Sequence, residues 1–336
     1  MTHAAILSNL ISPRNPFAAG VESHDAVLRL SQPMTLAHGG VLSEVRVAWR
    51  LSGPAGAPVV CALGGISADR HVCSWWGNLV GAGKAIDTGR RQVLAFDFLG
   101  GNGATTGPRS TGAAVFPDVS TFDQAYILAA LLDHLAIPRL AAFVGASYGG
   151  MVALAFASLY PERVERLVVI SAAHKASPLG TAWRTIQRRI VALGTAHGSA
   201  HDGLALARAL AMTTYRTPGE FDSRFDAPRR VTADPDAFPV WEYLDARGAD
   251  YVTHMLPEAF VTLSRSIDLH RIEPEQITTP LNLVAVAQDQ LVPPALVGEL
   301  ARRAGGVATV VACESIFGHD AFLKEEAFFT KIFERI

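Results

Sequence analysis

The residue best suited to covalent chemistry is Ser147, in the run from Gly145 to Gly149 that reads Gly-Ala-Ser-Tyr-Gly. An apolar stretch typical of a buried strand precedes this run, and a helical pattern follows it. In that context Gly-x-Ser-x-Gly forms a tight turn that exposes a nucleophilic serine, and glycines are required because neighbouring backbone comes too close for a Cβ. The alternative is a glycine-rich turn with a solvated serine; the flanking strand and helix favour the nucleophile.

A serine hydroxyl needs a general base, which in turn is oriented by a carboxylate. In strand-turn-helix sites of this kind the partners follow in the chain order Ser, Asp, His. Among eleven histidines, His319 comes directly after the last strand-like run and before the C-terminal helical pattern, and Asp289 follows the preceding strand. A single aspartate after a strand is usually a helix cap, but three residues in this order predict a Ser147-Asp289-His319 triad.

Acyl transfer by such a triad also needs two backbone N–H groups that stabilise the oxyanion. The first is expected from Tyr148, the residue after the nucleophile. The second is expected from the loop after the strand 59–63, with Leu63 favoured as donor and Gly64 as the alternative. A Gly-Gly turn without chemical function is the competing interpretation of this loop.

These residues are connected by alternating strand-like and helical segments. The strand-like runs are continuous and rich in Val, Ala and Leu, as in a parallel sheet covered on both faces. The order predicts an α/β fold, a doubly wound and mostly parallel sheet. The predicted strands are 45–51, 59–63, 93–98, 140–144, 167–170, 281–287 and 307–313, and the predicted helices are 120–135, 148–160, 295–304 and 320–336.

The alternation stops between residues 177 and 270, where strand-like sequence is missing. Helical patterns at 181–193, 203–213 and 260–269 are separated by pieces expected to be irregular, around Pro218, Pro228, Pro235 and Pro239. A helical insertion at the strand ends of an α/β sheet forms a lid over the site. We therefore expect a core made of 1–176 and 271–336, and a helical lid at 177–270.

Composition excludes several classes of function. The chain has 336 residues, 49% of them hydrophobic and 18% charged, and a net charge of −2. This balance argues against a nucleic-acid partner and against intrinsic disorder. Apolar runs are too short to span a membrane, and residues 1–20 are expected to be a loose cytosolic N-terminus. Three scattered cysteines predict neither disulfides nor a metal site, and Cys61 and Cys313 are expected to be buried.

Several further motifs follow one another along the chain: Trp75-Trp76, 83–88 (GKAIDT), 99–108 (LGG to TGP), 147–151 (SYGGM), 160–164 (YPERV), 214–217 (TYRT) and 318–323 (GHDAFL). Together they make the chain resemble the homoserine O-acyltransferases of the α/β-hydrolase superfamily. Tyr148 departs from the family, which usually has methionine there, and the loop 64–70 departs as well.

The resemblance implies an α/β-hydrolase fold with a helical lid, and transfer of an acyl group from acyl-CoA to L-homoserine in methionine biosynthesis. It implies that Arg216 holds the homoserine carboxylate, for which a guanidinium fork is suited, and that Asp320 receives the ammonium group. Without the resemblance, a surface ion pair and a helix N-cap would be the expected roles of these two residues.

The acyl donor depends on Arg184, where the acetyltransferases of the family usually have a neutral residue. A guanidinium near the acyl site would pair with the distal carboxylate of a succinyl group, whereas an acetyl group would leave it unpaired. We expect succinyl-CoA as donor. Acetyl-CoA as donor, L-serine as acceptor, an esterase or thioesterase, and a binding protein with an inert triad are the alternatives, in that order.

The resemblance also implies an enzyme without a bound cofactor or metal, with acyl-CoA as co-substrate. Its expected partners are small molecules and a second copy of the chain, since relatives are often homodimers. Cytoplasmic localisation is expected, with no contact to nucleic acid or membrane.

Overall fold

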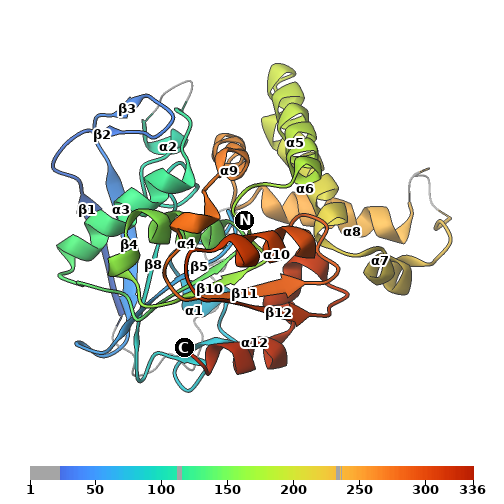
Figure 1. The fold of residues 1–336 in the computed structure, drawn as a ribbon. Helices are drawn as coiled ribbons and strands as arrows, with labels where there is room; N and C mark the ends of the chain where they lie inside the picture. Colours follow the sequence, from blue (N-terminus) through green and yellow to red (C-terminus); the bar gives the residue numbers. More distant parts are fainter. Residues whose placement is uncertain (1–22, 112–115, 232–234, 236) are drawn as a thin grey trace, which may run out of the picture.

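A computed structural model describes residues 23–111, 116–231, 235 and 237–336 (Figure 1). The N-terminal segment 1–20 lies outside the described residues. Within them, no helix is long and apolar enough to cross a membrane.

A single mixed sheet forms the centre of the molecule, as predicted. Its eight strands within the described chain follow the order β1-β4-β8-β5-β9-β10-β11-β12. Neighbours from β8 to β12 are parallel, whereas β1 and β4 are antiparallel at one edge. The strands are β1 (Ser23–Arg29), β4 (Arg46–Ser52), β5 (Val59–Leu63), β8 (Gln92–Phe96), β9 (Ala142–Ala146), β10 (Leu167–Ile170), β11 (Leu281–Val286) and β12 (Ala308–Cys313).

Strand β1 was not predicted, because most of its residues are exposed at the sheet edge and its apolar alternation is short. Two short ribbons accompany the sheet. They pair β2 (Met34–Thr35) with β3 (Val41–Leu42), and β6 (Val80–Gly81) with β7 (Ile86–Asp87).

Helices cover the sheet between successive strands. The helix α3 begins at Ser120 with a reciprocal cap, in which the Ser120 hydroxyl accepts from the Asp123 N–H and the Asp123 carboxylate accepts from the Ser120 N–H. The core helices are α1 (Val72–Trp75), α2 (Pro108–Thr111), α3 (Thr121–His134), α4 (Tyr148–Leu159), α10 (Pro294–Arg303), α11 (Ala321–Lys324) and α12 (Glu326–Phe333), with 3₁₀ turns η1 (Pro161–Arg163), η2 (Pro274–Gln276) and η3 (Gly318–Asp320).

The prediction of one C-terminal helix over 320–336 is wrong. Glu325 leaves helical geometry (φ −88°, ψ 60°) and separates α11 from α12. Its carboxylate accepts a hydrogen bond of 2.7 Å from the Ser315 hydroxyl. The break therefore connects the end of α11 to the loop that carries His319.

The described residues between β10 and β11 form a helical insertion of five helices: α5 (Pro178–Ala196), α6 (Ala200–Tyr215), α7 (Pro218–Phe225), α8 (Pro239–Tyr251) and α9 (Pro257–Leu269). The helices α7 and α8 occupy sequence expected to be irregular. Pro218 and Pro239 are their first residues, a position where the missing N–H costs nothing. Figure 1 shows α5, α6, α7 and α8 projecting away from the sheet, with α9 returning over the core.

The insertion is joined to the core by a buried histidine. The Nε2–H of His270 donates to the Ala173 carbonyl at 3.1 Å, and its Nδ1 accepts from the Thr121 hydroxyl at 2.7 Å. Burial lowers the pKa of His270 to about 3, so the ring is neutral at physiological pH. Cys61 and Cys313 are buried in the core, as expected.

Candidate active site

Ser147 lies on a sharp turn between β9 and α4, at the carboxyl edge of the sheet. Its backbone is left-handed (φ 54°, ψ −120°), an uncommon conformation for a residue other than glycine. The turn requires its glycines: a Cβ on Gly145 would lie 2.3 Å from the Gly149 carbonyl oxygen, and a Cβ on Gly149 would lie 2.4 Å from the Leu63 carbonyl oxygen. This strain presents the Ser147 side chain at the N-terminus of α4, where the helix dipole favours negative charge.

His319 and Asp289 meet Ser147 in one hydrogen-bonded row. The Ser147 Oγ lies 2.8 Å from Nε2 of His319, whose Nδ1 lies 2.7 Å from Oδ2 of Asp289. The other oxygen of Asp289 accepts from the N–H groups of Leu291 (2.9 Å) and Val292 (3.0 Å), which fixes the carboxylate. The structure therefore brings together the three residues predicted as a triad.

The electrostatics of this row favour a basic imidazole. Burial opposes protonation of His319, but the charge and the hydrogen bond of Asp289 outweigh it, so the pKa of His319 is raised above its usual value. The ring also stacks on Tyr215, with centroids 5.6 Å apart. A base with a raised pKa and one fixed tautomer is suited to accept the Ser147 proton.

The histidine loop is held in place by the tryptophan pair. The indole N–H of Trp76, which is 1% exposed, donates to the Phe322 carbonyl at 2.9 Å. Trp75 stacks on Trp76 with centroids 5.2 Å apart. The motif at Trp75-Trp76 thus fixes α11, and with it His319, from a segment more than two hundred residues earlier.

The predicted oxyanion donors lie next to each other. Tyr148 is the first residue of α4, and Leu63 is the last residue of β5. The Gly149 N–H donates to the Gly64 carbonyl at 2.8 Å, so the loop after β5 contacts the nucleophile turn directly. The roles of the Leu63 and Tyr148 N–H groups remain predictions.

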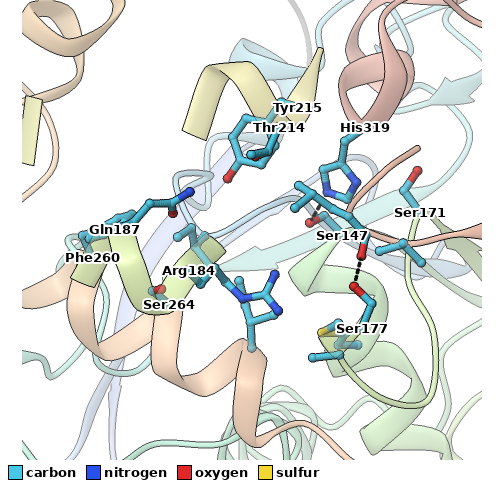
Figure 2. A pocket seen from close by; sticks show the side chains of 16 residues that line it. Ser147, Ser171, Ser177, Arg184, Gln187, Thr214, Tyr215, Phe260, Ser264 and His319 are labelled. Atoms are coloured by element: carbon cyan, nitrogen blue, oxygen red, sulfur yellow. Dashed lines mark hydrogen bonds between the residues drawn. The ribbon is translucent and has the colours of Figure 1, made fainter. Parts of the chain in front are cut away.

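Two cavities open at Ser147 and His319. The first, which we call the Arg184 cavity, extends between the core and α5; in Figure 2 the guanidinium of Arg184 and the hydroxyl of Ser147 both face it. The second, the Arg208 cavity, is more open and includes Ser67, Trp75, Arg208 and Asp320. Tyr215 and Ile267 line both cavities. A bound molecule could reach the serine from either side.

Arg184 is half-buried, and its hydrogen-bonding capacity is only partly used. Its Nε donates to Oδ1 of Asp268 at 2.8 Å, and its Nη2 lies 2.7 Å from the same oxygen without hydrogen-bond geometry. Arg188 donates to the other Asp268 oxygen at 2.7 Å and also to Ser264 and Thr185. One carboxylate thus balances two guanidinium groups, and the trio carries a formal net charge of about +1 beside the nucleophile.

Arg216 is predicted to bind a substrate carboxylate, but it is not among the residues that line either cavity. Its Nη1 donates to both oxygens of Glu220, and its Nε lies 3.0 Å from Asp320 Oδ2. Glu220 is 3% exposed, so this ion pair is buried. Arg216 thus reaches the Arg208 cavity only through Asp320, and its role toward a substrate carboxylate remains a prediction.

The guanidinium in the second cavity belongs to Arg208, which sequence reasoning missed. Its Cζ lies 4.6 Å from the Tyr251 ring centroid and 5.3 Å from the Tyr215 ring centroid. Arg208 precedes Tyr215 by seven residues on α6, two turns along one helix face. This spacing is the feature of the sequence that could have placed Arg208 on the same helix face as Tyr215. Asp320 faces the same cavity, and its side chain makes no cap bond to α11.

No group of three or more His, Cys, Asp or Glu side chains in the described part of the chain could hold a metal ion. Arg184 and Arg208, which line the two cavities, are side chains suited to bind organic anions.

Comparisons with known proteins identify the family. The family described as alpha/beta hydrolase fold matches residues 58–323. A homoserine O-succinyltransferase from Xanthomonas campestris pv. campestris is 47% identical over 290 residues, which cover 84% of this chain and 76% of that protein. The chain belongs to the homoserine O-acyltransferase family.

Other relatives agree with this assignment. A homoserine O-acetyltransferase from Symbiobacterium thermophilum is 31% identical, with 87% of this chain and 88% of that protein covered. The solved homoserine O-acetyltransferase from Bacillus anthracis superposes with a TM-score of 0.83 at 22% identity, covering 94% and 97% of the two chains. Esterase E22 gives 0.84 at 23% identity, covering 94% and 99%. These two structures establish the fold alone.

Proposed function

We propose that this enzyme transfers a succinyl group from succinyl-CoA to the hydroxyl of L-homoserine. The observation that carries the proposal is that Arg184 lines the cavity of the nucleophile and forms, with Arg188 and Asp268 behind it, a cluster with surplus positive charge. The distal carboxylate of a succinyl group would neutralise it, and an acetyl group would leave it uncompensated. The name of the Xanthomonas relative supports the same donor.

The reaction proceeds in two half-reactions. His319, oriented by Asp289, takes the hydroxyl proton of Ser147 while Oγ attacks the thioester carbonyl. The N–H groups of Leu63 and Tyr148 stabilise the oxyanion. The intermediate collapses by breaking the C–S bond, the CoA thiolate takes the proton from His319, and a succinyl ester of Ser147 remains.

L-Homoserine then resolves the ester. Its carboxylate binds Arg208 and its ammonium binds Asp320, the two opposite charges of the Arg208 cavity. His319 removes the hydroxyl proton as that oxygen attacks the ester, and the same proton returns to Ser147 Oγ as O-succinylhomoserine leaves. The helical insertion acts as a lid that must exclude water, since water would convert transfer into hydrolysis. The product fits the methionine biosynthesis to which the family belongs.

We further infer a cytoplasmic homodimer. The supporting observation is a set of exposed apolar side chains on the insertion, since such patches are typical of protein contacts. Leu193 is 63% exposed on α5 and Leu206 is 49% exposed on α6. Sedimentation of a species with the mass of one chain would contradict the dimer.

Thiol release tests the donor and the acceptor together. Purified enzyme is mixed with succinyl-CoA or acetyl-CoA, each with L-homoserine, L-serine or neither. Release that requires both succinyl-CoA and L-homoserine is the expected result. Equal use of acetyl-CoA would overturn the donor and leave the triad intact, preference for L-serine would overturn the acceptor, and rapid release without an acceptor would indicate a thioesterase.

A further inference from the structure

The side chain of Tyr148 is a buried polar group that the mechanism above does not use. Only its N–H is assigned a role, yet its hydroxyl lies in the interior, and the residue is 1% exposed. The ring packs edge-on against Phe98, with centroids 4.9 Å apart. Methionine, the usual residue of the family here, would fill the space without a hydroxyl. A buried hydroxyl is expected to have hydrogen-bond partners, and these partners can indicate its role.

This hydroxyl connects the core to the lid. Gln124 on α3 donates from Nε2 to the Tyr148 oxygen (3.2 Å) and to the Leu99 carbonyl (2.8 Å), and its Oε1 accepts from the Leu99 N–H (3.0 Å). Because Gln124 is the donor, the Tyr148 hydroxyl proton is free to bond Ser266 Oγ, 2.7 Å away on α9. Gln124 and Ser266 are fully buried.

The helix α9 carries the acyl-recognition groups two residues to either side of this contact. Ser264 accepts from Arg188, and Asp268 accepts from Arg184 and Arg188. The helix is thus fixed on one face to the nucleophile turn and on the other to α5.

We infer that the side chain of Tyr148 is a positioning residue, which sets its own N–H relative to the acyl cavity by bonding Gln124 and Ser266. The inference rests on the proposed function, in which this N–H stabilises the oxyanion. Such a donor acts only within a narrow distance range of about 2.7–3.1 Å. Loss of the hydroxyl removes the Tyr148 partner of Ser266 and one hydrogen bond of Gln124, which keeps its two bonds to Leu99. It also releases the turn from α9, so we expect the loss of oxyanion stabilisation to appear in the transition state.

The test compares Tyr148→Phe, Ser266→Ala and the double variant with the wild type. The rate of CoA release in acylation is expected to fall about tenfold in Tyr148→Phe, with KM for the acyl donor within about twofold. The pH profile stays that of the wild type, because His319 and Asp289 are untouched. The double variant is expected to be no slower than Tyr148→Phe, since both substitutions remove one interaction.

Thr121→Val is the matched control. It removes another fully buried hydroxyl that joins core to insertion, through His270 and away from the turn. We expect it to lower the melting temperature without changing the acylation rate. A wild-type rate in Tyr148→Phe, or additive losses in the double variant, would overturn the inference.

A second measurement separates this inference from the proposed function. Phosphonylation of Ser147 by an activated phosphonate ester needs the oxyanion donors but no acyl-CoA, and should also slow about tenfold in Tyr148→Phe. If the wild type used no acyl-CoA, the proposed function would fail while this measurement still decided the role of Tyr148. If Tyr148→Phe did not fold, Ser266→Ala would decide it, because that substitution leaves the aromatic packing in place.

Discussion

The carboxyl edge of the sheet and the helical insertion use their polar groups in different ways. At the sheet edge, Ser147 is hydrogen-bonded to His319, and His319 is hydrogen-bonded to Asp289. In the insertion, the charges meet one another: Arg184 shares Asp268 with Arg188, and Arg216 lies between carboxylates. The hydrogen bonds of Ser147, His319 and Asp289 are complete without a substrate, whereas a carboxylate that binds Arg184 must join or displace its ion pair with Asp268.

This difference suggests that the sheet edge determines the reaction and that the insertion determines which substrates are used. Ser147, His319 and Asp289 lie on a strained turn and after strand ends. The positions of this turn and of these strand ends are determined by the core packing of the α/β fold. The arginines lie on helices of the insertion, whose sequence can change without disturbing that packing. A change at the sheet edge should therefore affect every substrate, and a change in the insertion should affect one substrate over another.

The largest effect is expected from removing the nucleophile. Ser147→Ala should lower acyl transfer by about 10⁴-fold or more with every donor, since no covalent intermediate can form. CoA release measures it. Ser158→Ala on the same helix α4 is the control, because its hydroxyl donates to the Ala155 carbonyl of its own helix. A donor-dependent loss in Ser147→Ala would contradict a shared catalytic row.

The next largest effect is expected from Asp289→Asn, which should lower kcat/KM by about 10³–10⁴-fold. His319 must be neutral to act as base, so activity falls as pH falls through its raised pKa. The amide removes the charge that raises this pKa while burial remains, and the acid limb of the profile should move to lower pH. The pH dependence of kcat/KM checks this shift; an unmoved limb would exclude Asp289 as its cause.

A change in the insertion should instead discriminate between donors. Arg184→Met should lower kcat/KM for succinyl-CoA by about 10²-fold and change that for acetyl-CoA by less than about threefold, because an acetyl group makes no use of the guanidinium. The ratio of the two constants is the measurement. Arg189→Met, on the exposed side of α5, is the control. Equal losses with both donors would show that Arg184 is structural.

The smallest effect distinguishes the two arginines near Asp320. Arg208→Met should raise KM for L-homoserine by about 10-fold or more and leave the acylation half-reaction unchanged. Arg216→Met should mainly lower the melting temperature, since buried Glu220 loses an ion-pair partner. Steady-state kinetics and thermal unfolding of both variants provide the comparison. A larger rise in KM for Arg216→Met would return the acceptor role to that residue.

The sequence predicts the sheet edge better than the insertion, for a physical reason. The turn around Ser147 needs its glycines locally, and Asp289 and His319 follow strands whose order fixes their place. The contacts of the insertion join residues far apart in sequence, such as Arg184 with Asp268, 84 positions later. Likewise, the local motif around Arg216 cannot show that buried Glu220 is its partner.

Two smaller differences have the same origin. The sequence predicts irregular chain around Pro218 and Pro239, but these residues begin α7 and α8 because proline fits the first helical position. Glu325 interrupts a continuous helical pattern because its carboxylate is engaged by Ser315. In both cases the residue type alone does not determine the local structure. It also depends on the residue's position in the element or on its partner elsewhere in the fold.

Intact-mass spectrometry tests the central claim most directly. Enzyme mixed with succinyl-CoA alone should gain the mass of one succinyl group on the peptide that contains Ser147, and L-homoserine should discharge it to give O-succinylhomoserine. Ser147→Ala should gain no mass. Homoserine-dependent product formed with no adduct in the wild type, or with an adduct in Ser147→Ala, would contradict transfer through a succinyl-serine ester.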